Sequence, residues 1–71
     1  MSTPTKTIRI LAAAARRIAE TNVVARIDAD QAATEALSGA GFDVGAMHPA
    51  EYAAACDCMT AALLALGVRV N

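Results

Sequence analysis

The chain has 71 residues and a formal net charge of −1, a length that allows one small domain. A domain near this size buries only about 60% of the surface that its unfolded chain exposes, so its stability is marginal. Hydrophobic residues make up 56% of the chain, but alanine supplies much of that share and adds little buried area. Because so thin a core usually needs a disulfide, a metal or a partner subunit, we expect a homo-oligomer.

Charge is unevenly distributed along the chain. Residues 1–26 hold five of the basic residues against Glu20 alone, whereas residues 27–71 hold Arg69 against six acids. A phosphate-binding surface would therefore have to lie on the first segment. No charge-free stretch near the C-terminus approaches the roughly 20 residues of a membrane span. Two cysteines without a secretory signal fit a reducing cytoplasm, so we expect a soluble cytoplasmic protein with no membrane partner.

Residues 6–21 are predicted to form an amphipathic helix. Its apolar stripe recurs at helical spacing and consists of Ile8, Leu11, Ala15 and Ile18. The opposite side carries the basic residues that are candidate nucleic-acid contacts, namely Lys6, Arg9, Arg16 and Arg17. A solvated basic face is the favoured interpretation of this pattern, and contact with a nucleic-acid backbone is the alternative.

Residues 28–38 are predicted to form the second helix. Asp28 followed by Gln31 is a capping box that marks a helix start. Gly39 is expected to take the left-handed conformation that ends the helix. The glycine-containing segment that follows predicts a loop with a short helical turn around residues 42–47.

The third predicted helix spans residues 49–66. Pro49 suits the first helical position, Glu51 suits the positive end of the helix dipole, and Gly67 suits the stop. Large residues recur at spacings of four and three, which predicts a heptad-like seam for packing or oligomer contact. This seam consists of Tyr52, Cys56, Met59, Leu63 and Leu66.

A second face of this helix is made of small residues: Ala50, Ala54, Ala61 and Ala65. Small side chains let helices approach closely. A chain of this size has little material to cover both faces. We expect either the other two helices or another chain to pack there.

The residues with reactive side chains do not form a recognisable catalytic or metal pattern. Cys56 and Cys58 point nearly opposite ways on a helix, so they suit neither one zinc ion nor an intrachain disulfide, and Cys58 is expected to face away from the seam, among alanines. His48 has no nucleophile or carboxylate spaced for a proton relay, and a polar residue ending a loop is the simpler interpretation. The glycines of GAGFDVG do not follow a strand, as a phosphate loop requires. We therefore predict no catalysis, no metal and no cofactor.

A helix-turn-helix DNA reader is disfavoured by charge. The chain has no lysine or arginine between Arg26 and Arg69, where a recognition helix would have to contact phosphates. A nucleic-acid-binding transcriptional regulator that uses the first predicted helix remains the alternative function.

The sequence thus predicts an all-α, small three-helix domain over residues 1–71. A short two-stranded ribbon between residues 23–27 and 67–70 is a further expectation. The favoured function is a small non-catalytic regulator or inhibitor that occupies a surface of a larger protein. Its candidate contacts are the exposed acids Asp28, Asp30, Glu35, Asp43, Glu51 and Asp57. The alanine- and arginine-rich composition suggests a bacterial or phage origin, where anti-CRISPR-like inhibition of a host defence nuclease complex is a base-rate expectation without a supporting motif.

Overall fold

A computed structural model describes residues 5–21 and 26–71 of the chain. The described residues form three α-helices and one 3-10 turn: α1 (Thr5–Thr21), α2 (Ala29–Gly39), η1 (Val44–Ala46) and α3 (Pro49–Ala65). The predicted all-α three-helix fold is confirmed, and each helix boundary lies within one residue of its predicted place. No helix in the described ranges is long and apolar enough to cross a membrane.

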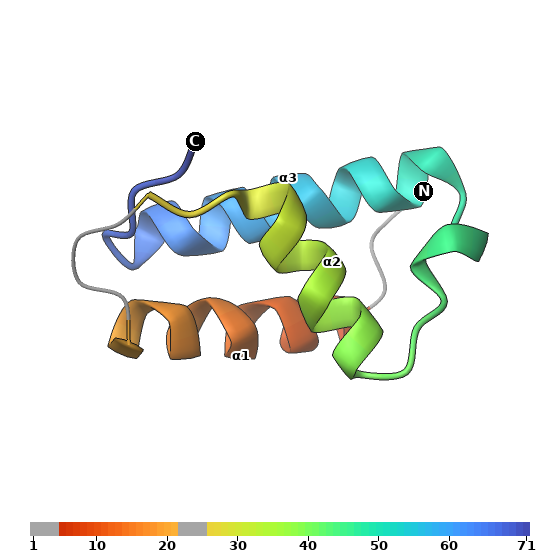
Figure 1. The fold of residues 1–71 in the computed structure, drawn as a ribbon, viewed down its shortest axis with the longest axis horizontal. Coiled ribbons are helices and arrows are strands. Elements are labelled where there is room, and N and C mark those ends of the chain that lie inside the picture. Colours follow the sequence, from red (N-terminus) through yellow and green to blue (C-terminus); the bar gives the residue numbers. More distant parts are fainter. Residues whose placement is uncertain (1–4, 22–25) are drawn as a thin grey trace.

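The three helices pack against one another around one core (Figure 1). α1 and α3 run in the same direction, and α2 crosses them obliquely. The largest fully buried side chains come from all three helices: Leu11, Leu37, Met59 and Leu63. Fully buried alanines lie beside them, and their small side chains let the helix backbones come close together.

The inner face of α1 differs from the predicted stripe at one position. Thr7, Leu11 and Ala15, every fourth residue, are buried, whereas Ile8 is 42% exposed. Ile18 is partly buried against the core, as predicted. Each helical residue turns by about 100°, so an inner face centred on the row that begins at Thr7 turns Ile8 outward.

The start of α2 is capped by Asp28. Its carboxylate Oδ1 accepts hydrogen bonds from the backbone N–H groups of Asp30 (3.1 Å) and Gln31 (3.3 Å). These two bonds satisfy backbone donors that the first helical turn leaves unpaired. The Gln31 side chain donates instead to Glu35 Oε1 at 3.4 Å, so the reciprocal half of the predicted capping box is replaced by a contact along the helix.

The end of α2 lies later than predicted. Gly39 is the last helical residue, and it is Gly41 that has a positive φ of 94°. The N–H of Phe42 donates to the carbonyl of Leu37 at 3.0 Å, which satisfies a carbonyl at the helix end. This bond needs the left-handed residue directly before Phe42, which explains why Gly41 adopts it. Phe42 then packs partly buried against the core, as does Met47 beyond η1.

The C-terminal segment returns to the start of α2. Ile27 and Val70 form one isolated parallel bridge, in which Ile27 N–H donates to Arg69 O at 2.8 Å and Asn71 N–H donates to Ile27 O at 3.0 Å. The predicted ribbon is therefore reduced to this bridge, and no strand forms in residues 26–71. Residues 23–25 of the predicted ribbon lie outside the described residues.

Candidate functional site

The predicted seam of α3 faces the protein's own core. Met59 and Leu63 are fully buried, Cys56 is 8% exposed, and Tyr52 is partly buried. α3 packs against both α1 and α2. This side of the helix is therefore occupied within the chain and offers no free surface to a second copy.

Leu66 does not belong to this seam. It is 46% exposed, because α3 ends at Ala65 and Leu66 is the C-cap residue. Gly67 then turns the backbone with a φ of 80°, which confirms it as the stop. Val68, only 8% exposed, takes the core position instead, and its N–H donates to Leu63 O at 2.9 Å.

The opposite side of α3 is open to solvent, and we call it the outer face. It consists of Ala50, Ala53, Ala54, Asp57, Ala61, Leu64 and Ala65, all exposed except the partly exposed Ala54. At 100° per residue these side chains occupy an arc of about 120°. Leu64 is 57% exposed. No other described segment covers this face, and Asp57 is the one charged residue in it.

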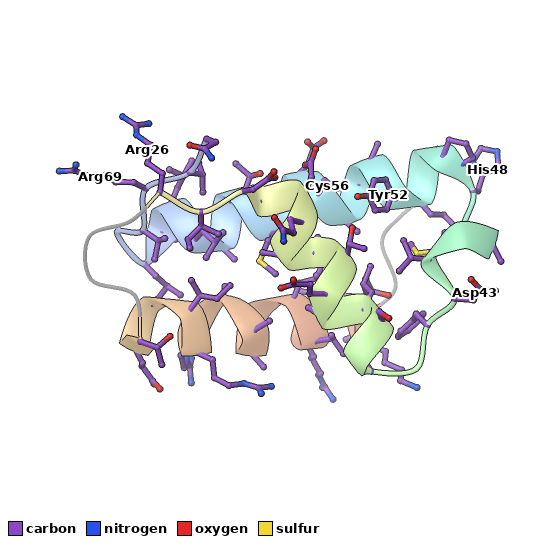
Figure 2. The ribbon with its side chains drawn as sticks, in the orientation of Figure 1. Arg26, Asp43, His48, Tyr52, Cys56 and Arg69 are labelled. Atoms are coloured by element: carbon purple, nitrogen blue, oxygen red, sulfur yellow. The ribbon has the colours of Figure 1, made fainter. Side chains whose placement is uncertain are left out.

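The six predicted acidic contacts are all exposed, but they are spread along the chain. Asp28 caps α2, Asp43 precedes η1 (Figure 2), and Asp57 lies in the middle of α3. Asp30 lies in the first turn of α2, and Glu51 lies in the first turn of α3. The predicted acidic contacts therefore do not form one compact patch on a single helix.

The Cys56 side chain lies in the core, where it is 8% exposed. Burial is the main cause that raises its pKa above the ordinary value of 9.0, a hydrogen bond from Tyr52 acts against this, and the charge of Asp30 adds to the rise. A thiol with a raised pKa stays protonated near neutral pH and is a poor nucleophile. Cys58 is half-buried at the edge of the core, so it does not point fully away from the seam as predicted.

Tyr52 fastens α3 to α2. Its hydroxyl lies 2.7 Å from Thr34 Oγ1 and also approaches Asp30 O at 3.5 Å. Thr34 Oγ1 in turn donates to Asp30 O at 2.9 Å. Figure 2 shows Tyr52 and Cys56 on the same stretch of α3. This hydrogen-bonded edge holds the acidic first turn of α2 against α3.

The predicted basic residues lie on the solvent side of α1: Lys6, Arg9, Arg16 and Arg17. The Lys6 ammonium lies 5.7 Å from the centre of the Phe42 ring, which is within the range of a cation–π contact. One of the four cations is thus engaged within the chain. The other three leave a basic surface along α1.

The predicted ribbon between residues 23–27 and 67–70 places Arg26 near Arg69, and the bridge that forms there brings them together. The Ile27–Val70 bridge brings the exposed residues Arg26 and Arg69 to the same end of the molecule (Figure 2). The sequence analysis placed them in opposite charge halves of the chain. The alternating apolar pattern around each arginine, which predicted the ribbon, is therefore also the signal for this basic pair.

His48 has a structural role at the start of α3. Its Nδ1 accepts a hydrogen bond from the Ala50 N–H at 3.0 Å, directly before Pro49 at the first helical position. Within residues 5–21 and 26–71, no group of three or more His, Cys, Asp or Glu side chains lies close enough to hold a metal ion.

No family model, curated protein or solved structure matches the chain. Its surfaces are therefore the basis for assigning a function. Two of them are clearly different: the outer face of α3 is apolar with a single acid, and the outward side of α1 is basic.

Proposed function

We propose that the chain is a small non-catalytic regulator or inhibitor that occupies a surface of a larger protein through the outer face of α3. The observation that carries this proposal is the exposure of an apolar helix face from Ala50 to Ala65. At 1.5 Å per residue this face is about 22 Å long. Its alanines allow a partner backbone to approach closely, and Leu64 provides one large apolar side chain to bury.

The negative charge of Asp57 on the outer face favours a partner with a basic contact surface. Asp57 stands near the middle of the face in both sequence and direction. A partner that buries this face has to supply a lysine or arginine opposite Asp57, because an unpaired buried carboxylate is costly.

A second copy of the chain fits this face less well. In a symmetric dimer the same patch meets itself, so residues near its centre lie near the twofold axis. Two Asp57 carboxylates would then face each other, and like charges brought together oppose association. We therefore favour a different, larger protein with a basic contact surface.

Proteins that bind nucleic acid carry such basic surfaces. A host defence nuclease complex of the kind that anti-CRISPR proteins inhibit is one partner of this class. An exposed set of carboxylates can pair with basic residues that normally contact phosphates. This part of the proposal has its support in charge alone.

The first test is site-specific photocrosslinking in an extract of the source cell. A benzophenone side chain at Ala61, on the outer face, is expected to capture a larger protein. The matched control is Ala12, which is exposed on α1. Capture from Ala12 but not from Ala61 contradicts the proposal, as does capture of this chain alone.

The second test uses the captured protein in purified form. Asp57→Lys is expected to weaken binding by roughly tenfold or more, because it places like charges opposite each other. Asp43→Lys changes the net charge equally but lies outside the outer face. Reversing Asp28, Asp30 and Glu35 together tests the wider acidic set. Equal affinities for the Asp57 and Asp43 variants contradict the proposed contact.

Nucleic-acid binding through α1 is the second candidate function. It is favoured by the exposed cations on the outward side of that helix. It predicts binding that weakens steeply with salt and is lost when Arg9, Arg16 and Arg17 are changed to alanine. A gel-shift assay at low salt without a shifted band eliminates this candidate.

A further inference from the structure

An open groove of about 630 Å³ runs between α1 and α2. Its floor is apolar: Ile10, Ala14 and Ile18 come from α1, and Ala32 and Ala36 come from α2. Both isoleucines are only partly buried, although they pack against the core. The groove therefore leaves large aliphatic surface in contact with water, and covering that surface is favourable.

The two rims of the groove carry opposite charges. Arg9 and Arg17 line the α1 side and are both exposed. They are eight residues apart, so their backbones are about 12 Å apart along the helix and their side chains leave it about 80° apart around its axis. Glu35 lines the α2 side and is also exposed, with one weak hydrogen bond of 3.4 Å from the Gln31 side chain.

We propose that this groove binds an amphipathic helix of a protein partner. The apolar stripe of that helix covers Ile10 and Ile18. Two carboxylates about seven residues apart on one edge of it pair with Arg9 and Arg17, because this spacing spans about 10 Å along a helix. A basic residue on its other edge pairs with Glu35. The inference rests on the proposed protein-binding function and adds a second surface together with the class of segment that fits it.

A nucleic acid fits the groove poorly. Arg9 and Arg17 suit phosphates, but Glu35 on the facing rim repels them. The sugar-phosphate backbone of a nucleic acid is strongly hydrated, so covering the isoleucine floor with it would stabilise the complex little. The outward basic side of α1 shares Arg9 and Arg17 with the groove rim, and a nucleic acid lying along it would leave the isoleucine floor uncovered.

A second copy of the chain also fits poorly. The described helix with an exposed apolar face is α3, and its acid Asp57 lies in the middle of that face. Docked into the groove, this carboxylate would be pressed onto Ile10 and Ile18, away from the arginine rim. The groove instead needs acids at the edge of an apolar stripe.

The test uses the full chain and a designed fluorescent peptide of about 18 residues, long enough to form a helix when bound. The peptide carries leucines at helical spacing, two glutamates seven residues apart on one edge and a lysine on the other. A second peptide exchanges the charges and has two lysines and one glutamate. Binding is measured by fluorescence anisotropy, and methyl NMR shifts of Ile10 and Ile18 report its location.

The glutamate peptide is expected to bind saturably and to shift both isoleucines. The double variant Arg9→Glu and Arg17→Glu is expected to weaken the glutamate peptide roughly tenfold and to strengthen the lysine peptide by a similar factor. Because this variant gains one ligand as it loses the other, misfolding cannot account for the exchange. Glu35→Lys is expected to give a smaller change, since it affects a single pair.

Three outcomes overturn the inference. One is equal binding of both peptides to the native chain, or no binding at all. Another is displacement of the peptide by duplex DNA, with an affinity that falls steeply with salt. The third is a light-scattering mass of two chains that returns to one chain when Ile18 is changed to aspartate. Asp57→Lys should leave peptide binding unchanged, so failure at the outer face of α3 is distinguished from failure at the groove.

Discussion

α1 and α3 have the same length, 17 residues each, and lie side by side, but their solvent sides are unlike. The outward side of α1 carries Arg9, Arg16 and Arg17, which water solvates well. The outward side of α3 carries alanines, Leu64 and a single acid. Folding requires one apolar face on each helix, and both helices have it. The second apolar face of α3 has no counterpart on the outward side of α1, and it does not pack in the described core.

The largest difference in the stability lost on substitution by alanine should appear between two neighbouring leucines of α3. Leu63 is fully buried and Leu64 is 57% exposed. Leu63→Ala is expected to lower the free energy of unfolding by about 2–5 kcal/mol, through lost burial and the cavity left behind. Leu64→Ala is expected to change it by less than about 0.5 kcal/mol. Urea unfolding followed by circular dichroism measures both, and equal losses would remove the distinction between the two faces.

α2 crosses both helices, so its start affects how firmly they are joined. Asp28→Ala removes the side chain that accepts from two backbone N–H groups and is expected to cost about 0.5–2 kcal/mol. Asp43 is the matched control, because it precedes η1 without forming a side-chain cap bond. Asp43→Ala should be nearly neutral in the same urea titration. A neutral Asp28→Ala would mean that packing alone holds the start of α2.

The edge of α3 that meets α2 depends on one side-chain pair. Tyr52→Phe removes the hydroxyl that lies 2.7 Å from Thr34 Oγ1 and is expected to cost about 0.5–1.5 kcal/mol. A double-mutant cycle with Thr34→Val separates this pair from the bond of Thr34 to Asp30 O. Additive losses in the cycle would show that the two hydroxyls are not coupled.

The smallest expected effect is a pH dependence from Cys56. Its pKa is raised in the folded chain, mainly by burial, so folding favours the protonated thiol. This contribution to stability is fully present below the ordinary value of 9.0 and is lost as the pH rises from there through the folded pKa. Unfolding free energies at about pH 7 and about pH 10 measure the loss. Cys56→Ala should fall less between these two conditions, and an equal fall in both proteins would contradict the assignment.

The helix boundaries were predictable because their signals are local. Asp28, Pro49 and Gly67 each act on backbone groups within one or two turns, and all three have the predicted roles. The position of Gly41 was missed because the end of α2 also depends on where Phe42 has to enter the core. Local signals thus predicted the starts of α2 and α3 and the end of α3, but not the residue that ends α2.

The side of a helix that is buried was less predictable. Leu66 fits the spacing of the seam, but the helix ends before it, and Val68 fills the core from beyond the turn. Thr7 is buried in place of Ile8 because the direction of the inner face depends on the neighbouring helices. The groove likewise combines Ile18 of α1 with Ala36 of α2, and no spacing within either helix predicts that pairing.

The packing of α1 against α3, which run in the same direction, has a consequence for folding during synthesis. α1 packs against both α2 and α3, so its inner face is only partly covered until synthesis has passed Leu63. Leu11 on α1 is therefore fully covered only after α3 has been made. A nascent chain stalled before α3 should be a target for chaperones or proteases.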